Sequence, residues 1–141
     1  MYGRYEFLAF YVFLTLTIMW FIFMTYLSHQ DGEHTGRTSR KLAEGLSEHI
    51  CFLDADINVL IGKLRRFAHI VVFAVLTVLL GLTLQFGELS MWWLIIAPVW
   101  SYVDEATKPL IQGRHFSWFD VGQNLIGTVI GAVVVWILQV L

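Results

Sequence analysis

Apolar runs long enough to cross a lipid bilayer constrain this chain more than any other feature of its sequence. Three such runs occupy residues 6–27, 67–86 and 119–141. A helix needs about 20 mostly apolar residues to span a hydrocarbon layer of about 30 Å, and the first run is too long for the apolar region of a cleavable signal peptide. Hydrophobic residues make up 57% of the chain and charged residues 14%, as is typical of a membrane protein. We therefore predict an all-α membrane protein with one domain, residues 1–141.

A fourth apolar run, residues 90–103, is too short to cross a membrane by itself. Its 14 residues would extend only about 21 Å as a helix. To reach the other side, the helix must continue through Asp104 and Glu105 toward Leu110, which places two carboxylates inside the end of the helix. Pro109 has no N–H, so the carbonyl of Glu105 would lose its usual i+4 partner there. The sequence thus predicts a bundle of about four transmembrane helices.

The segment between the first two runs, residues 28–66, is polar at first and periodic afterwards. From residue 40 to residue 62, leucine and isoleucine recur every three or four positions, which is typical of an amphipathic helix. These apolar positions are Leu42, Leu46, Ile50, Leu53, Ile57 and Leu60. We expect this helix to lie on the membrane surface or to pack on the bundle.

Four spans would bring polar residues from distant parts of the sequence to one rim of the bundle. The second span begins, the third ends and the fourth begins on the same side of the membrane. The polar residues expected at that rim are Arg66, His69, Asp104, Glu105, Lys108, Arg114, Asp120 and Asn124. Because ionisable groups facing lipid are costly, they should face inward and pair with one another. We expect Asp104 or Glu105 to lie within hydrogen-bonding reach of Arg114 or Arg66.

The last span carries one narrow stripe of polar and small residues. Asp120, Asn124, Gly127 and Gly131 follow one another at intervals of four, three and four residues, which places them on one helix face. The G-x-x-x-G pair permits a close approach of another helix. Ser117, three residues before Asp120, is a candidate cap for the start of this helix.

Composition and cysteine count exclude several classes of function. Lysine and arginine number 9 against 11 aspartates and glutamates, so no basic surplus indicates a nucleic-acid partner. The lone Cys51 cannot form an intramolecular disulfide. Four further histidines lack the mutual spacing of metal ligands; they are His29, His34, His49 and His115. The sequence predicts neither a metal site nor a cofactor.

Residues 104–127, "DEATKPLIQGRHFSWFDVGQNLIG", resemble the signature of VanZ-like membrane proteins. In that family an Asp-Glu pair is followed by a Gly-Arg turn, then an Asp, an Asp or Asn, and a Gly. The matching residues here are Asp104, Glu105, Gly113, Arg114, Asp120, Asn124 and Gly127. "RRFAH" resembles the family's basic-x-x-His start of the second span, which adds Arg66 and His69. Two departures are Lys108, where the family often has Gln, and Gln112, where it often has Pro.

The resemblance implies a small multi-pass protein of the bacterial cell membrane. The family's founding member is linked to teicoplanin resistance. We therefore expect low-level resistance to teicoplanin or lipoglycopeptides, or recognition of a lipid-linked envelope component by the polar cluster. Arg66 and Arg114 would meet phosphate or carboxylate groups. The partners would be the lipid bilayer and such a ligand, with a homo-oligomer left open.

Two other functions stay open. One is an intramembrane enzyme acting on a lipid headgroup, in which His69 would be the general base and Arg114 would stabilise developing charge. The other is a structural assembly partner, in which the polar cluster would hold helices together. Orientation is open as well, because eight of the nine basic residues lie on the rim side. The positive-inside rule places that rim in the cytoplasm, whereas a role against external glycopeptides favours the outside.

Overall fold

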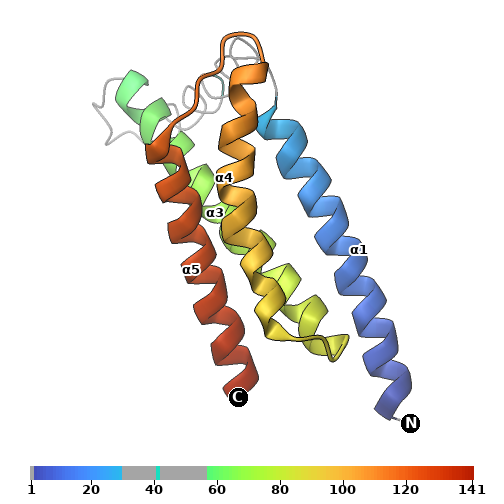
Figure 1. Ribbon diagram of the computed structural model, residues 1–141. Helices are drawn as coiled ribbons and strands as arrows, with labels where there is room; N and C mark the ends of the chain where they lie inside the picture. The colour runs from blue at the N-terminus through green and yellow to red at the C-terminus, as the bar shows by residue number, and fades with distance from the viewer. Residues whose placement is uncertain (1, 30–40, 42–56) are drawn as a thin grey trace.

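The computed structural model describes residues 2–29, 41 and 57–141, and over these ranges the protein is helical with no strand. Helix α1 covers Tyr2–Ser28, α3 covers Ile57–Phe86 and α5 covers Trp118–Val140. Between α3 and α5, the 3-10 helix η1 (Met91–Ile95) leads into α4 (Ile96–Thr107), and the short η2 (Lys108–Leu110) follows. The four α-helices run side by side, with both termini at one end (Figure 1).

Among the described residues, three helices are long and apolar enough to cross a membrane: Gly3–Ser28, Ile61–Phe86 and Trp118–Val140. The three long apolar runs fall within these helices, except for Leu141. The predicted helices are therefore confirmed in class and position, and their crossing of a membrane stays a prediction. The expected continuation of the third element is also confirmed, because α4 extends through both carboxylates to Thr107. With 12 residues, α4 is too short to cross alone. A fourth crossing, made by η1, α4 and η2 together, stays a prediction.

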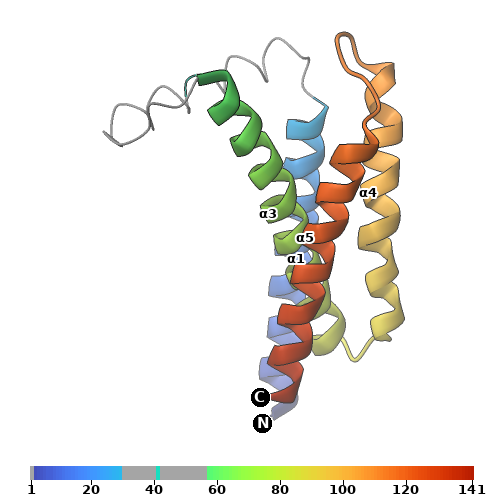
Figure 2. The ribbon, with the colours of Figure 1, turned by 90° about the vertical axis from the view of Figure 1, so that its left-hand side faces the viewer.

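Most of the predicted amphipathic helix, residues 40–62, lies outside the described residues. Its last part, from Ile57, forms the beginning of α3 and is continuous with the membrane-spanning part of that helix. Figure 2 shows that this beginning of α3 leans away from the other helices, while the rest of α3 runs alongside α5. The polar rim of the bundle is therefore wider than its middle.

Helices α3 and α5 approach each other so closely that glycine is required between them. A Cβ atom at Gly127 would lie 2.2 Å from the carbonyl oxygen of Ile70, and one at Gly131 would lie 2.6 Å from that of Ala74. Real side chains cannot occupy those positions without a shift of the backbone, so the predicted role of the G-x-x-x-G pair in close helix packing is confirmed.

Helix α1 packs on α3 through apolar and polar contacts. Met24 is buried against Phe73 and Leu76, and the indole Nε1–H of Trp20 donates a hydrogen bond of 3.0 Å to the carbonyl of Val72. The other faces of α1 and α5 expose large apolar side chains, such as Met19. Such exposure is unfavourable in water and suits contact with lipid.

Helix α4 ends where Pro109 removes a backbone donor. The N–H of Lys108 donates to the carbonyl of Glu105, three residues back, and the N–H of Ile111 donates to the carbonyl of Lys108 over 2.9 Å. The last turn therefore tightens into a 3-10 helix. In this way the carbonyl of Glu105, to which Pro109 has no N–H to donate, still accepts a hydrogen bond. This tightening keeps Lys108 on the same helix face as the carboxylates that precede it.

Candidate functional site

The end of α1, the start of α3, the end of α4 and the start of α5 meet at one end of the bundle (Figure 1). Three ionisable side chains there are almost fully buried: Asp104 is 1% exposed, Glu105 0% and Lys108 2%. Asn124 is also buried completely. Burial of charges is costly unless each has a partner, so the contacts of these groups define the site.

Glu105 and Lys108 form a buried ion pair, in which the ammonium group Nζ of Lys108 donates to Oε1 of Glu105. Oδ2 of Asp104 lies 4.0 Å from the same ammonium group. Residues three and four apart share a helix face, which is why Lys108 turns inward toward both carboxylates. The sequence did not suggest Lys108 as the partner of Glu105, and a contact of Asp104 or Glu105 with Arg114 or Arg66 stays a prediction.

Asp104 also ties α4 to the end of α1. The hydroxyl of Ser28 donates to Oδ2 of Asp104 over 2.8 Å, and Nδ1 of His29 lies 3.9 Å from Oδ1. Nε2 of His29 lies 2.9 Å from the hydroxyl oxygen of Thr107. Sequence reasoning missed Ser28 and His29 as parts of this cluster. The signal was present, because they are the first polar residues after the first span and so belong to the same rim.

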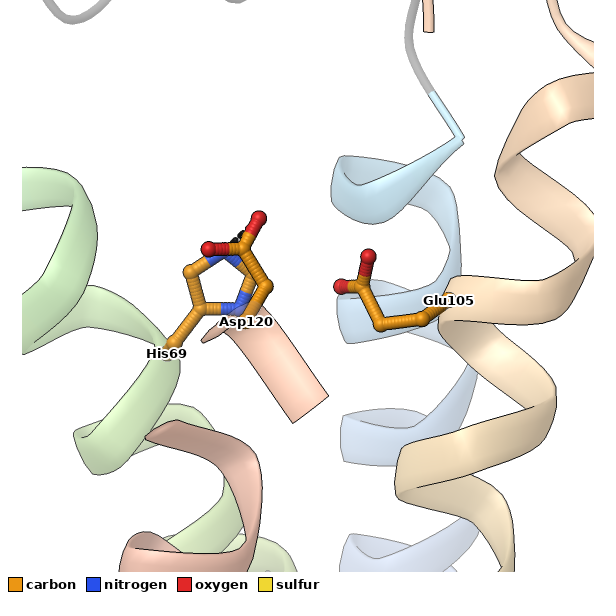
Figure 3. Close-up of side chains that lie close together, drawn as sticks. All are labelled: His69, Glu105 and Asp120. Atoms are coloured by element: carbon orange, nitrogen blue, oxygen red, sulfur yellow. Dashed lines mark ion pairs between the residues drawn. The ribbon is translucent and has the colours of Figure 1, made fainter. Parts of the chain in front are cut away.

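His69 joins α3 to α5 through two neighbours. Nδ1 of His69 lies 2.9 Å from Oδ1 of Asn124. Nε2 lies 3.9 Å from Oδ2 of Asp120, whose backbone N–H donates over 3.2 Å to the capping hydroxyl of Ser117. Figure 3 shows the side chains of His69, Glu105 and Asp120 directed toward one another. The structure thus brings together four of the predicted site residues from three helices.

The two arginines of the predicted site differ in position. Arg66 is exposed, and its guanidinium carbon lies 5.2 Å from the centre of the Phe119 ring, a cation–π arrangement. Arg114 is half-buried. Burial lowers the pKa of Arg114 from its ordinary value and the nearby positive charge of Arg65 lowers it further, while the carboxylates of the site act in the opposite direction. Arg114 therefore lies within the field of the buried carboxylates.

Gly113 sets the direction of the loop that carries Arg114. Its φ of 76° falls in the left-handed region that favours glycine. The turn places the N–H of Arg114 3.1 Å from the carbonyl of Ile111, so the chain doubles back directly after η2. The positive φ at this position explains why the predicted Gly-Arg turn has a glycine there.

A pocket of about 300 Å³ opens between this loop, the end of α4 and the starts of α3 and α5. Its lining combines three cationic side chains with one carboxylate and several uncharged groups. The lining residues are Arg65, Lys108, Gly113, Arg114, His115, Phe116, Ser117 and Asp120. Arg65 is the lining residue that the start of α3 contributes.

Apolar helices with a buried polar cluster at one end define a helical membrane protein with a candidate binding site at its rim. A family model, VanZ/LLP1, matches residues 11–139. Because the match covers most of the chain, the protein belongs to the VanZ/LLP1 family. Neither the curated proteins nor the solved structures contain a match to it. The resemblance seen in the sequence is therefore confirmed at the level of the family.

Proposed function

We propose that this protein recognises the anionic headgroup of an amphiphile, either a lipid-linked intermediate of the envelope or a lipoglycopeptide, in the bacterial cell membrane. The observation that carries the proposal is the cationic pocket at the polar end of the bundle, with Arg65, Lys108 and Arg114 in its lining. Guanidinium groups bind phosphate and carboxylate through paired, charge-assisted hydrogen bonds. Lipid-exposed helices beneath the pocket give the apolar part of the ligand a place to lie.

The dimensions and lining of the pocket suit one small headgroup. Its volume of about 300 Å³ is at the lower end of the range for ligand sites, which runs from about 300 to 1,000 Å³. The arginines would bind the phosphate or carboxylate. Asp120 would accept hydrogen bonds from hydroxyl groups of an attached sugar, and Ser117 could accept or donate them. The ring of Phe116 would pack on the apolar face of that sugar.

Replacement of the pocket arginines is expected to weaken headgroup binding. Arg65→Gln and Arg114→Gln each remove a charge-assisted contact, so each should reduce affinity for a polyprenyl phosphate by about tenfold or more. The measurement is a titration of purified protein in nanodiscs, read by native mass spectrometry. Arg4→Gln is the matched control, because Arg4 is exposed at the opposite end of α1. Equal binding of polyprenyl phosphate and the uncharged polyprenol would contradict the proposal.

Expression in a susceptible Gram-positive host tests the resistance role. We expect the wild-type protein to raise tolerance to teicoplanin and Arg114→Gln to abolish that rise, because the loop arginine would no longer bind the acidic group. Membrane-inserted protein is quantified in parallel. The resistance role is rejected if wild-type protein inserts normally and tolerance stays at the level of the empty vector.

A second candidate is an intramembrane enzyme acting on the headgroup, favoured by the position of His69. Its ring is held by Asn124 while Nε2 faces Asp120, an arrangement that suits a general base. Release of inorganic phosphate from polyprenyl diphosphate by wild type but not His69→Gln would support this candidate. The third function is that of a structural assembly partner, in which the polar cluster only holds helices together. It is rejected if His69→Gln and Arg114→Lys abolish headgroup binding or teicoplanin tolerance while the protein inserts normally.

A further inference from the structure

We infer that His69, Glu105 and Asp120 form a binding site for one divalent transition-metal ion of the zinc type. Each side chain offers one ligand atom, and these three atoms lie within 4.8 Å of one another. The residues come from α3, α4 and α5, and their side chains point to a common centre (Figure 3). No sequence spacing could reveal this set, because its members are 36 and 15 residues apart.

The hydrogen bond of His69 leaves Nε2 ready to bind a cation. The amide oxygen of Asn124 can only accept, so Nδ1 of His69, 2.9 Å away, carries the proton and donates. In the neutral ring Nε2 then presents a lone pair. That lone pair faces Oδ2 of Asp120 at 3.9 Å, another acceptor, and two acceptors repel each other unless a cation lies between them. Histidines that bind metals commonly donate their second ring N–H in this way.

Glu105 supplies the second and independent observation. Its side chain is completely buried, and Lys108 occupies Oε1. Oε2 has no hydrogen-bond partner among the described residues. A buried carboxylate oxygen without a partner is costly, and this carboxylate is directed toward His69 and Asp120 (Figure 3). A metal ion at the common centre would satisfy it.

The charges around the centre also favour a cation. Asp104, Glu105 and Asp120 contribute three negative charges, and within the same cluster Lys108 and Arg114 offset two. One net negative charge therefore stays in a site that is largely removed from water. A divalent ion would turn this balance to one net positive charge, which would in turn favour an anionic ligand.

The donor set indicates the class of metal. One imidazole nitrogen and two carboxylate oxygens suit zinc, and also manganese and iron, better than calcium or magnesium, which take oxygen ligands. Bonds of about 2.0–2.2 Å require ligand atoms about 3.3–3.6 Å apart, so the side chains would draw together by about 1 Å. Three protein ligands leave a coordination position open. Because Asp120 also lines the pocket, that open position would lie at the boundary between the cluster and the pocket.

The metal alone tests the site, so the test is independent of headgroup binding. Full-length protein carrying a histidine-free tag is stripped with a chelator in detergent and titrated with Zn²⁺. We expect about one high-affinity ion per chain and a loss of at least tenfold in affinity for His69→Ala and for Asp120→Asn. Glu88→Gln is the control, because Glu88 is an exposed carboxylate in the turn after α3, at the other end of the bundle. Wild-type protein that binds no Zn²⁺ would overturn the inference.

If those variants fail to fold, replacement of a metal-binding side chain by cysteine provides a second test. His69→Cys and Asp120→Cys each keep a zinc ligand at the site, and with Co²⁺ each should add a thiolate-to-cobalt charge-transfer band that wild-type protein lacks. Glu88→Cys, at the other end of the bundle, should add none. Cysteine variants that bind Co²⁺ without this band would place the ion elsewhere and overturn the assignment.

Discussion

Lys108→Ala is expected to destabilise this protein more than any other single charge removal at the rim. The ammonium group binds Glu105 and lies 4.0 Å from Asp104, and all three side chains are buried. Its loss leaves two adjacent carboxylates without their shared cation. Breaking a buried pair typically costs about 3–5 kcal/mol, so we expect a decrease of that size in the free energy of unfolding, measured by detergent denaturation of the purified protein.

Glu105→Ala should cost less than Lys108→Ala, because Asp104 would still balance the ammonium group. Lys108→Met combined with Glu105→Gln should cost less than the sum of the two single changes, because the double variant leaves fewer buried charges uncompensated. Lys63→Ala, at an exposed position of α3, is the control and should change stability by no more than about 0.5 kcal/mol. Losses from Lys108→Ala as small as those from Lys63→Ala would show that the pair is solvated.

Gly127→Ala is the second change with a large expected effect. The added methyl group would lie 2.2 Å from the carbonyl oxygen of Ile70, a backbone atom that cannot move without its helix. Overpacking typically costs about 1–3 kcal/mol, and this contact should reach the upper end because α3 and α5 must separate. The measurement is again the free energy of unfolding, with the fraction of monodisperse protein after extraction as a second readout.

Gly122→Ala provides a matched control on the same helix, since a Cβ there would meet nothing within 4 Å. It exchanges the same two residue types and should be neutral or slightly stabilising, because alanine favours the helix. If Gly127→Ala and Gly122→Ala behave alike, α3 and α5 do not pack as closely as described. If only Gly127→Ala is destabilised, the face of α5 that carries Gly127 is a packing surface for α3.

Separation of α3 and α5 would also disturb the candidate site. His69 on α3 contacts Asn124 on α5, and these residues lie about one turn from the close contact between Ile70 and Gly127. The small residues thus hold the polar residues in register. We expect Gly127→Ala to weaken headgroup binding together with stability, whereas Arg114→Gln, in the loop, should weaken binding without separating α3 from α5.

The sequence by itself indicated a helical membrane protein and several of the residues that gather at the rim. Apolar runs of about 20 residues are typical of helices that cross a membrane, and among the described residues three helices have the length and apolar character for it. The short fourth run correctly predicted that α4 continues past Glu105. An apolar run of 14 residues is too short for a spanning helix, so the helix has to include the polar residues that follow it. The stripe from Asp120 to Gly131 was also predictable from the sequence, because helical periodicity alone places those residues on one face.

Only the tertiary structure decided which polar groups pair. The sequence did not suggest Lys108 as a partner of Glu105, and this contact follows from the 3-10 turn at Pro109 and the i+3 spacing. The structure also joined Ser28 to Asp104 and brought Arg65 into the pocket. Periodicity determines the face on which a residue lies within its own helix. The choice of partner depends on the depth, tilt and rotation of neighbouring helices, which are set by side-chain packing across the whole bundle.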